Sequence, residues 1–229
     1  TVGIGYNALT ALTSGAKNIA IGYQCLDAQT DGERNIGIGY GALTAMDSGE
    51  DGNIAIGYLA GDSVNNASSV DNVFIGDEAG RGGTGAAIGN IAIGAHAMTN
   101  TASNAQTGSV AIGHNALTAL TSGAGNIAIG YASGAAMTTA NYNTILGYSA
   151  GNDLTTADSN VVIGYGAMDK ATTQASSNIA IGLYSMNGNW TTADVNFCVA
   201  IGQQTLDGVL TTAASGSVAI GYQALTALT

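Results

Sequence analysis

The stretch Asn-Ile-Ala-Ile-Gly-Tyr decides the fold of this chain, and it stands at residues 18–23, 53–58 and 126–131. Working outward from it, an Ile-Gly or Leu-Gly step recurs along the whole sequence at intervals of 17 to 20 residues. The glycine of this step occupies thirteen positions: Gly5, Gly22, Gly39, Gly57, Gly76, Gly94, Gly113, Gly130, Gly147, Gly164, Gly182, Gly202 and Gly221. A fixed period of this kind is typical of repeat proteins whose units stack on one another. We therefore expect a single array over residues 1–229.

The residues around this glycine alternate in size. Large apolar residues stand one position before it and, except for Thr144, three positions before it, and the residue two positions before it is mostly alanine or glycine. Period two predicts a β-strand, whereas a helix would repeat every three or four residues. Because both faces lack charge, we expect a strand buried on both sides. We interpret the isoleucines directly before the glycine as core columns: Ile4, Ile21, Ile38, Ile56, Ile75, Ile93, Ile112, Ile129, Ile163, Ile181, Ile201 and Ile220.

Asparagine recurs four positions before the glycine, and Ser109 and Ser217 replace it in two copies. Stacked asparagines can hydrogen-bond through their amides from one unit to the next. We expect such a ladder along the array: Asn18, Asn35, Asn53, Asn72, Asn90, Asn126, Asn143, Asn160 and Asn178.

These columns predict an all-β fold, a parallel β-solenoid (a β-roll or β-helix) of about 13 coils with 17–20 residues per coil. One coil alone buries too little apolar surface to offset the entropy of ordering its backbone, so the coils must stack. We expect a second short strand in the Ala-Leu-Thr-Ala-Leu-Thr stretches, as at 8–13 and 116–121, followed by a turn at Ser-Gly.

Composition excludes several classes of protein. The chain has 4 basic and 15 acidic residues and a net charge of -11, so it lacks the basic patch that nucleic acids or anionic membranes require. Its 35 glycines come without a single proline, which excludes collagen. Polar or glycine residues interrupt every apolar run, so we expect no membrane insertion in this segment.

The repeats resemble those of a known family. Ser-Val-Ala-Ile-Gly at 109–113 and 217–221, and the Asn-Ile-Ala-Ile-Gly copies, resemble the head repeats of YadA-type trimeric autotransporter adhesins. The longer form ending in Tyr-x-Ala-Leu is similar to repeats of bacteriophage tail fibres. The resemblance implies a left-handed β-roll, a homotrimer, and surfaces that bind host molecules. It differs in period, because the adhesin heads repeat at about 14 residues.

Catalytic chemistry finds little support in the sequence. His96 and His114 stand two and one residues after their glycines, so strand alternation would point them to opposite faces. The four basic residues, Lys17, Arg34, Arg81 and Lys170, are too scattered for a lyase-type site. We therefore expect no enzyme and no cofactor.

Acidic residues cluster in two adjacent repeats and leave two interpretations open. Carboxylates near glycine can hold calcium, although the calcium-binding Gly-Gly-x-Gly-x-Asp motif is absent. The alternative is solvated charge that keeps neighbouring rods from bundling. The candidates are Asp27, Asp31, Glu33, Asp47, Glu50 and Asp51.

Two further features are candidate contact sites. Trp190 and Phe197 lie in the longest interval between repeats, and exposed aromatic residues are favoured at receptor contacts. Threonine recurs eight or nine residues after the glycine, where a stripe could bind ice or glycans or could simply stabilise the coils. Its members are Thr13, Thr30, Thr84, Thr121, Thr138, Thr155, Thr172, Thr191 and Thr211.

Cys25 and Cys198 fall ten repeats apart, so we expect no disulfide between them. They are either buried small residues or partners for other chains. Both ends of the sequence fall within a repeat, so we expect the array to be open at both ends. It would then continue within a longer polypeptide or by end-to-end stacking of chains.

The sequence thus favours a non-enzymatic structural fibre, a rod or filament on a cell surface or virion or otherwise extracellular, held together by self-association. The alternative is an adhesin or tail-fibre module that recognises a surface glycan or protein. A minor alternative is ice binding through the threonine stripe.

Overall fold

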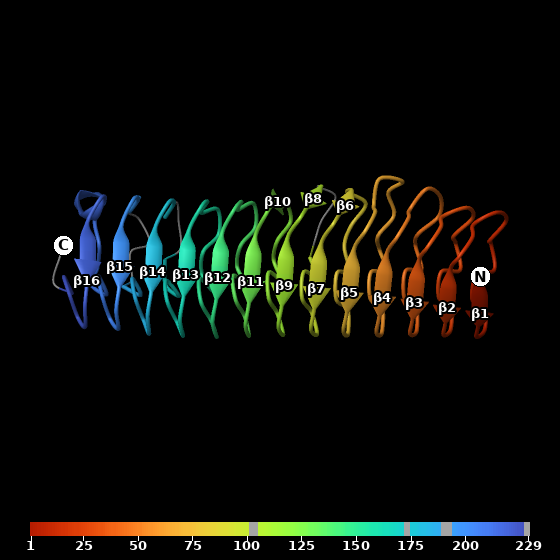
Figure 1. The fold of residues 1–229 in the computed structure, drawn as a ribbon, viewed down its shortest axis with the longest axis horizontal. Helices are drawn as coiled ribbons and strands as arrows, with labels where there is room; N and C mark the ends of the chain where they lie inside the picture. The colour runs from red at the N-terminus through yellow and green to blue at the C-terminus, as the bar shows by residue number, and fades with distance from the viewer. Residues whose placement is uncertain (101–104, 172–174, 189–193, 227–229) are drawn as a thin grey trace. The chain divides into compact units, whose positions relative to one another are not determined.

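The computed structural model describes residues 1–100, 105–171, 175–188 and 194–226. The chain divides into two compact units, residues 1–114 and 115–229. Each unit is a parallel β-solenoid, in which one short strand per coil pairs with its counterpart in the next coil (Figure 1). The predicted fold class is therefore confirmed.

The repeated strands are three residues long and coincide with the motif that defines the repeat. In the first unit they are β1 (Val2–Ile4), β2 (Ile19–Ile21), β3 (Ile36–Ile38), β4 (Ile54–Ile56), β5 (Val73–Ile75), β7 (Ile91–Ile93) and β9 (Val110–Ile112). In the second unit they are β11 (Ile127–Ile129), β12 (Thr144–Leu146), β13 (Val161–Ile163), β14 (Ile179–Ile181), β15 (Val199–Ile201) and β16 (Val218–Ile220). Pairing is in register, as when Ile21 faces Ile38 and Ile38 faces Ile56.

The asparagine ladder is confirmed. Asn35, for example, is fully buried, and its backbone N–H donates to Asn18 Oδ1 at 2.8 Å. Its own Oδ1 accepts the backbone N–H of Asn53 at 2.8 Å, and its Nδ2 donates to the carbonyl of Glu50 at 2.7 Å. Each amide therefore satisfies buried backbone groups of a neighbouring coil and of its own turn.

The assignment of the isoleucines to the core was wrong. The middle residue of the repeated strands from β2 to β16 is buried, as with Ala20 and Ala55, while the flanking isoleucines point outward: Ile21 is 36% exposed and Ile56 37%. The strands are thus buried on one face only. Leucine and methionine side chains from the turns, such as Leu26, fill the narrow interior of the coil, so the strand can present only a small residue to it.

Two coils show how tightly this interior is filled. Phe74 takes the place of the usual alanine, and Gly61 and Gly80 stand where other coils have leucine or methionine. A side chain carbon at Gly80 would collide with the Phe74 ring. Ile145 is matched in the same way by Gly134 and Gly151. A large residue in the strand is therefore compensated by a missing side chain in the turn.

The predicted second strand in the Ala-Leu-Thr stretches was also wrong, because these residues form turns. Leu26 and Leu43 adopt left-handed backbone angles, with φ of 51° and 54°, which are incompatible with a strand. Their N–H groups donate to the next coil, Leu26 to Ala42 at 3.1 Å. The additional short elements lie elsewhere: β6 (Ala87–Ile88), β8 (Gln106–Thr107), β10 (Gly123–Ala124) and a single 3₁₀ turn η1 (Thr212–Ala214).

Candidate interaction surface

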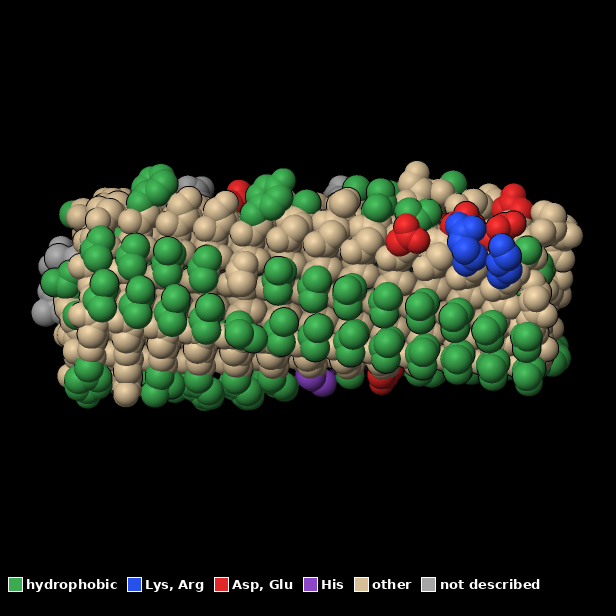
Figure 2. Space-filling model, in the orientation of Figure 1, with side chains coloured by type: hydrophobic (Ala, Val, Ile, Leu, Met, Phe, Trp, Pro, Cys, Tyr) green, Lys and Arg blue, Asp and Glu red, His purple; other side chains and the backbone are tan. Residues whose placement is uncertain are grey.

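The outward face of the repeated three-residue strands is an apolar surface. Isoleucine and valine side chains on either side of the buried strand residue line up from coil to coil, because the strands pair in register. Figure 2 shows them as rows of hydrophobic side chains. Monomeric soluble proteins rarely expose a contiguous apolar patch of this kind, and such patches mark interaction sites. We call the isoleucine and valine columns of the strands the isoleucine face.

A tyrosine column borders the isoleucine face, one residue after the repeat glycine. Tyr6, Tyr23, Tyr40 and Tyr58 stack in the first unit, with neighbouring ring centroids 5.3, 5.0 and 5.4 Å apart. Tyr131, Tyr148 and Tyr165 stack in the second unit at 4.8 and 5.3 Å. Asp77, Ala95 and His114 occupy this column in the remaining coils of the first unit.

The expectation that His96 and His114 point apart was wrong. Their rings pack edge to face, with centroids 5.8 Å apart. His96 Nδ1 also lies 3.5 Å from Glu78 Oε2. Strand alternation does not extend past the repeat glycine, because the chain turns there, so the one-residue offset does not separate the two rings.

The acidic calcium candidates do not come together. Among the described residues, no three His, Cys, Asp or Glu side chains form a group that could hold a metal ion. Asp51 instead accepts the backbone N–H of Glu33 and pairs with Arg34 at 3.2 Å. Asp31 Oδ1 accepts the backbone N–H of Gly49 at 2.9 Å, and Asp47 Oδ1 accepts that of Ser48 at 2.6 Å. Burial raises the pKa of Asp27.

Glu50 is the exception among these acids, because it is buried. Its side chain is fully buried together with that of Gln29, and neither side chain has a hydrogen-bond partner. Burial is the main cause that raises the pKa of the Glu50 carboxyl to about 6, and the nearby Asp47 carboxylate contributes to that rise. The Gln29 side chain and the Glu50 backbone both lie against Gly32, where an added side chain carbon would collide with Gln29 Nε2 and the Glu50 carbonyl oxygen. The sequence analysis missed this pair.

The threonine column binds the backbone. Thr13 and Thr30 donate their hydroxyls to the carbonyls of Thr30 and Asp47 at 2.9 and 2.8 Å. Thr121 and Thr138 repeat this in the second unit at 3.0 and 3.2 Å. These hydroxyls therefore link neighbouring coils. Thr172 and Thr191 lie outside the described residues.

Of the two aromatic contact candidates, Trp190 lies outside the described residues. Phe197 is 70% exposed, in the turn before β15. Cys25 and Cys198 are both buried, free thiols, and burial raises their pKa, to about 11 for Cys25. Cys198 takes the place of a ladder asparagine, and its Sγ contacts the carbonyl of Ala214 at 3.1 Å.

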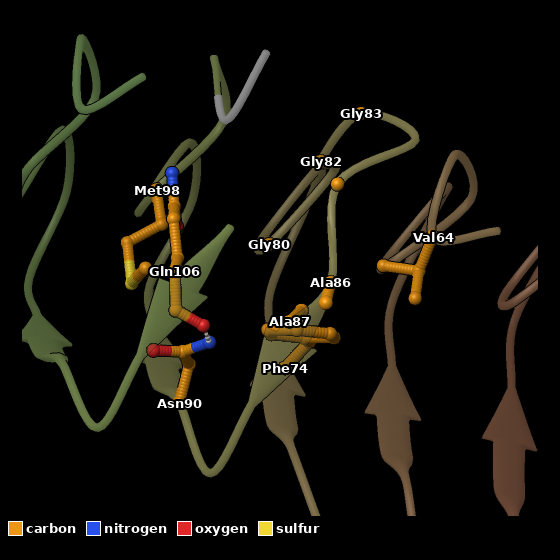
Figure 3. A pocket seen from close by; sticks show the side chains of 11 residues that line it. Val64, Phe74, Gly80, Gly82, Gly83, Ala86, Ala87, Asn90, Met98 and Gln106 are labelled. Atoms are coloured by element: carbon orange, nitrogen blue, oxygen red, sulfur yellow. Dashed lines mark hydrogen bonds between the residues drawn. The ribbon is translucent and has the colours of Figure 1, made fainter. Parts of the chain in front are cut away.

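Two hollows among the described residues are candidate ligand sites. The first, lined by Val64, Phe74 and Met98 and by Asn90, whose Nδ2 donates to the Gln106 carbonyl, has a volume of about 10 Å³ (Figure 3). That is room for about one water molecule, so it is a packing defect beside the large Phe74 ring and not a ligand pocket.

The second hollow is an open cleft of about 480 Å³ in the second unit. It is lined by Asp169, Lys170, Tyr184, Asn187, Gly188 and Asp207. Burial raises the pKa of both Asp169 and Asp207, while the Lys170 ammonium opposes that shift. Its polar lining and volume would accommodate a small polar ligand.

The fold and these surfaces define a β-solenoid repeat protein. No protein-family model, curated protein or solved structure matches the chain. Among the described residues, no helix is both long enough and apolar enough to cross a membrane.

Proposed function

We propose that this chain is a non-enzymatic structural fibre protein whose isoleucine face packs against other copies of the same chain. The single observation that supports this most is the exposed apolar face, whose isoleucines are spaced by the coils themselves. Copies with the same coil spacing can bring their isoleucine faces together around a symmetry axis, so that each copy covers the apolar surface of its neighbours. The resemblance to trimeric adhesin heads favours a homotrimer at a cell or virion surface.

The hydrogen bonds that run from coil to coil within each unit suit a mechanical role. Asparagine amides and threonine hydroxyls join neighbouring coils in addition to the strand pairing. A stack in which each coil hydrogen-bonds to its neighbour at several points resists local opening, and therefore proteolysis. A fibre built from copies that pack through the isoleucine face would share this resistance to proteolysis.

Sedimentation of the full chain tests this proposal. The wild type should be a trimer at micromolar concentration, and the variant Ile38→Asp/Ile56→Asp/Ile75→Asp should be a monomer with an unchanged circular dichroism spectrum. The matched control is Tyr142→Asp/Phe197→Asp/Val209→Asp, three exposed apolar residues outside the strands that form that face, at 68, 70 and 62% exposure. The control should remain a trimer. A wild type that is monomeric, or an Ile variant that still assembles, would contradict the proposal.

The cleft in the second unit favours a second candidate, a receptor-binding module that takes a surface glycan. Asp169 and Asp207 can accept hydrogen bonds from sugar hydroxyls, and the Tyr184 ring can contact the apolar face of a sugar. Binding to an array of defined glycans should fall in Asp169→Ala/Asp207→Ala and persist in Asp194→Ala, an exposed aspartate that does not line the cleft. Equal binding by all three proteins would rule the cleft out.

A further inference from the structure

The stacked tyrosines form two ladders of phenol rings held one coil apart. In the first unit the planes of neighbouring rings differ by 12, 8 and 22°, and in the second by 12 and 7°. The rings are accessible: Tyr23, Tyr40 and Tyr58 are 41, 48 and 52% exposed, and Tyr131, Tyr148 and Tyr165 are 45, 49 and 48% exposed. Each ladder therefore presents neighbouring phenols to solvent in a fixed, nearly parallel arrangement.

The backbone beneath the rings fixes this spacing. The residue before each of these tyrosines is the repeat glycine, and coils approach so closely there that a side chain carbon at Gly22 would collide with the Gly39 carbonyl. Beyond the glycine, the backbone N–H of Gln24 donates to the carbonyl of Tyr6 at 2.9 Å, and that of Gly41 to Tyr23 at 2.9 Å. The tyrosine rings of neighbouring coils can therefore move apart only if these hydrogen bonds between the coils break.

We propose that these ladders are sites of oxidative coupling, at which neighbouring tyrosines of one chain are joined as dityrosine. A one-electron oxidant, such as a haem peroxidase using hydrogen peroxide, removes one electron and one proton from each of two phenols. The two radicals couple through the ring carbons next to the oxygens, which forms one C–C bond. One C–H bond on each ring then breaks and its proton moves to the phenolic oxygen, so that each ring regains its hydroxyl and its aromaticity. The two electrons and two protons reduce one hydrogen peroxide to two water molecules.

The arrangement favours coupling inside a ladder over coupling elsewhere. Groups held as neighbours in one molecule have an effective concentration of about millimolar or more, roughly a thousandfold above that of a micromolar partner in solution. Tyr142 provides the contrast, because it is 68% exposed but stands in the turn before β12, away from the ladders. Tyr184 differs in geometry, since its ring meets that of Tyr165 at 88°.

The consequence would be a covalent link between successive coils. The two thiols of the chain are buried and free, so they do not provide such a link in this structure. Each dityrosine would close a loop of 17 or 18 residues, from one ladder tyrosine to the next, and would limit the freedom of the unfolded chain as a disulfide does. This inference concerns contacts within one chain and does not depend on the proposed fibre assembly.

Peroxidase treatment of the full chain, followed by digestion and mass spectrometry, tests the proposal. We expect peptides joined with the loss of two hydrogens between ladder neighbours, and a dityrosine yield per chain that does not fall when the protein is diluted. Free tyrosine in a parallel reaction shows that the oxidant is active. Absence of coupling in the chain under those conditions would overturn the proposal, as would products that join mainly Tyr142 or different chains.

Two triple variants sharpen the test. Tyr23→Phe/Tyr58→Phe/Tyr148→Phe leaves no two stacked neighbours that both carry a phenol, while keeping every ring. Tyr142→Phe/Tyr184→Phe/Tyr222→Phe removes the same number of phenols and keeps every stacked pair. The first should lose dityrosine by about tenfold, because it keeps no stacked pair of phenols, and the contact that remains between Tyr165 and Tyr184 is edge to face. The second should retain it. Equal yields from the two variants would contradict the proposal, and mapping the products of the wild type tests it even if a variant misfolds.

Discussion

Two buried polar regions of the first unit behave in opposite ways. The asparagine ladder is fully buried, yet its amides bond to backbone groups in the neighbouring coil and in their own turn. Gln29 and Glu50 are equally buried, but their side chains have no partner. The difference is that every coil of the ladder supplies the group its neighbour needs, whereas Gln29 and Glu50 each occur in a single coil. A repeat can therefore bury polar residues at little cost only when they recur.

Breaking the ladder should have the largest effect. Asn143 accepts the backbone N–H of Asn160 at 2.9 Å and donates to the carbonyl of Ala157 at 2.8 Å. In Asn143→Ala both backbone groups would be buried without a partner, so the free energy of unfolding should fall by about 2 to 5 kcal/mol. Chemical denaturation measures this. The adjacent exposed Tyr142→Ser should change it by less than about 0.5 kcal/mol, and similar losses at both positions would contradict the ladder's role.

Replacing Gln29 or Glu50 by a residue typical of its column should raise the free energy of unfolding, whereas the ladder substitution lowers it. Gln29 stands where other coils bury Met46 or Leu120, and Glu50 stands where most coils have glycine, alanine or serine. Glu50→Ala and Gln29→Leu should each raise the free energy of unfolding at neutral pH by about 1 to 3 kcal/mol, because a buried unsatisfied group is removed. A loss of stability in both variants would show that the pair has partners in solution.

The raised pKa of the Glu50 carboxyl predicts that the free energy of unfolding depends on pH. The pKa of Glu50 is about 6 in the folded chain against 4.5 ordinarily, so the folded state binds the proton more tightly. The contribution of the protonated Glu50 carboxyl to the free energy of unfolding is complete below about pH 4.5. It is lost as the pH rises through about 6, a change of about 2 kcal/mol. Denaturation at several pH values should show this fall in the wild type and a flatter profile in Glu50→Gln, which has no titrating group there. Identical profiles would place Glu50 in solvent.

The threonine hydroxyls should give the smallest effect. In Thr30→Val the hydroxyl bond to the Asp47 carbonyl is lost, but the backbone N–H of the same residue still donates to that oxygen at 2.6 Å. We expect a loss of about 1 kcal/mol or less in the free energy of unfolding. Thr10→Val, at an exposed turn position, serves as the control and should change it less. A loss at Thr30 as large as that at Asn143 would mean that the two columns contribute equally.

The sequence predicted the period, the strands and the asparagine ladder, because each depends on residues that recur at one position of the coil. It did not reveal which strand face is buried. Alternation distinguishes the two faces of a strand but does not show which of them is buried. The face with the larger apolar residues was predicted to be the core, and that prediction was wrong. The interior is instead filled by turn residues such as Leu26, and their left-handed backbone leaves no mark in composition.

The candidate surfaces were predictable only in part. The tyrosine column is visible in the sequence, but its stacking and exposure depend on the turn at the repeat glycine. That turn also explains why His96 and His114 meet. Gln29 could have been recognised as a polar residue in an apolar column, had the columns of the turns been aligned as carefully as those of the strands.

Adjacent residues of β4 test the inside-outside arrangement most directly. Ala55 is fully buried, and Ile56 is 37% exposed on the isoleucine face. Measured by chemical denaturation of dilute protein, Ala55→Asp should lower the free energy of unfolding by about 4 kcal/mol or more, because it buries an unpaired charge. Ile56→Asp should lower it by about 1 kcal/mol or less. A larger loss at Ile56 than at Ala55 would mean that the isoleucines form the core after all.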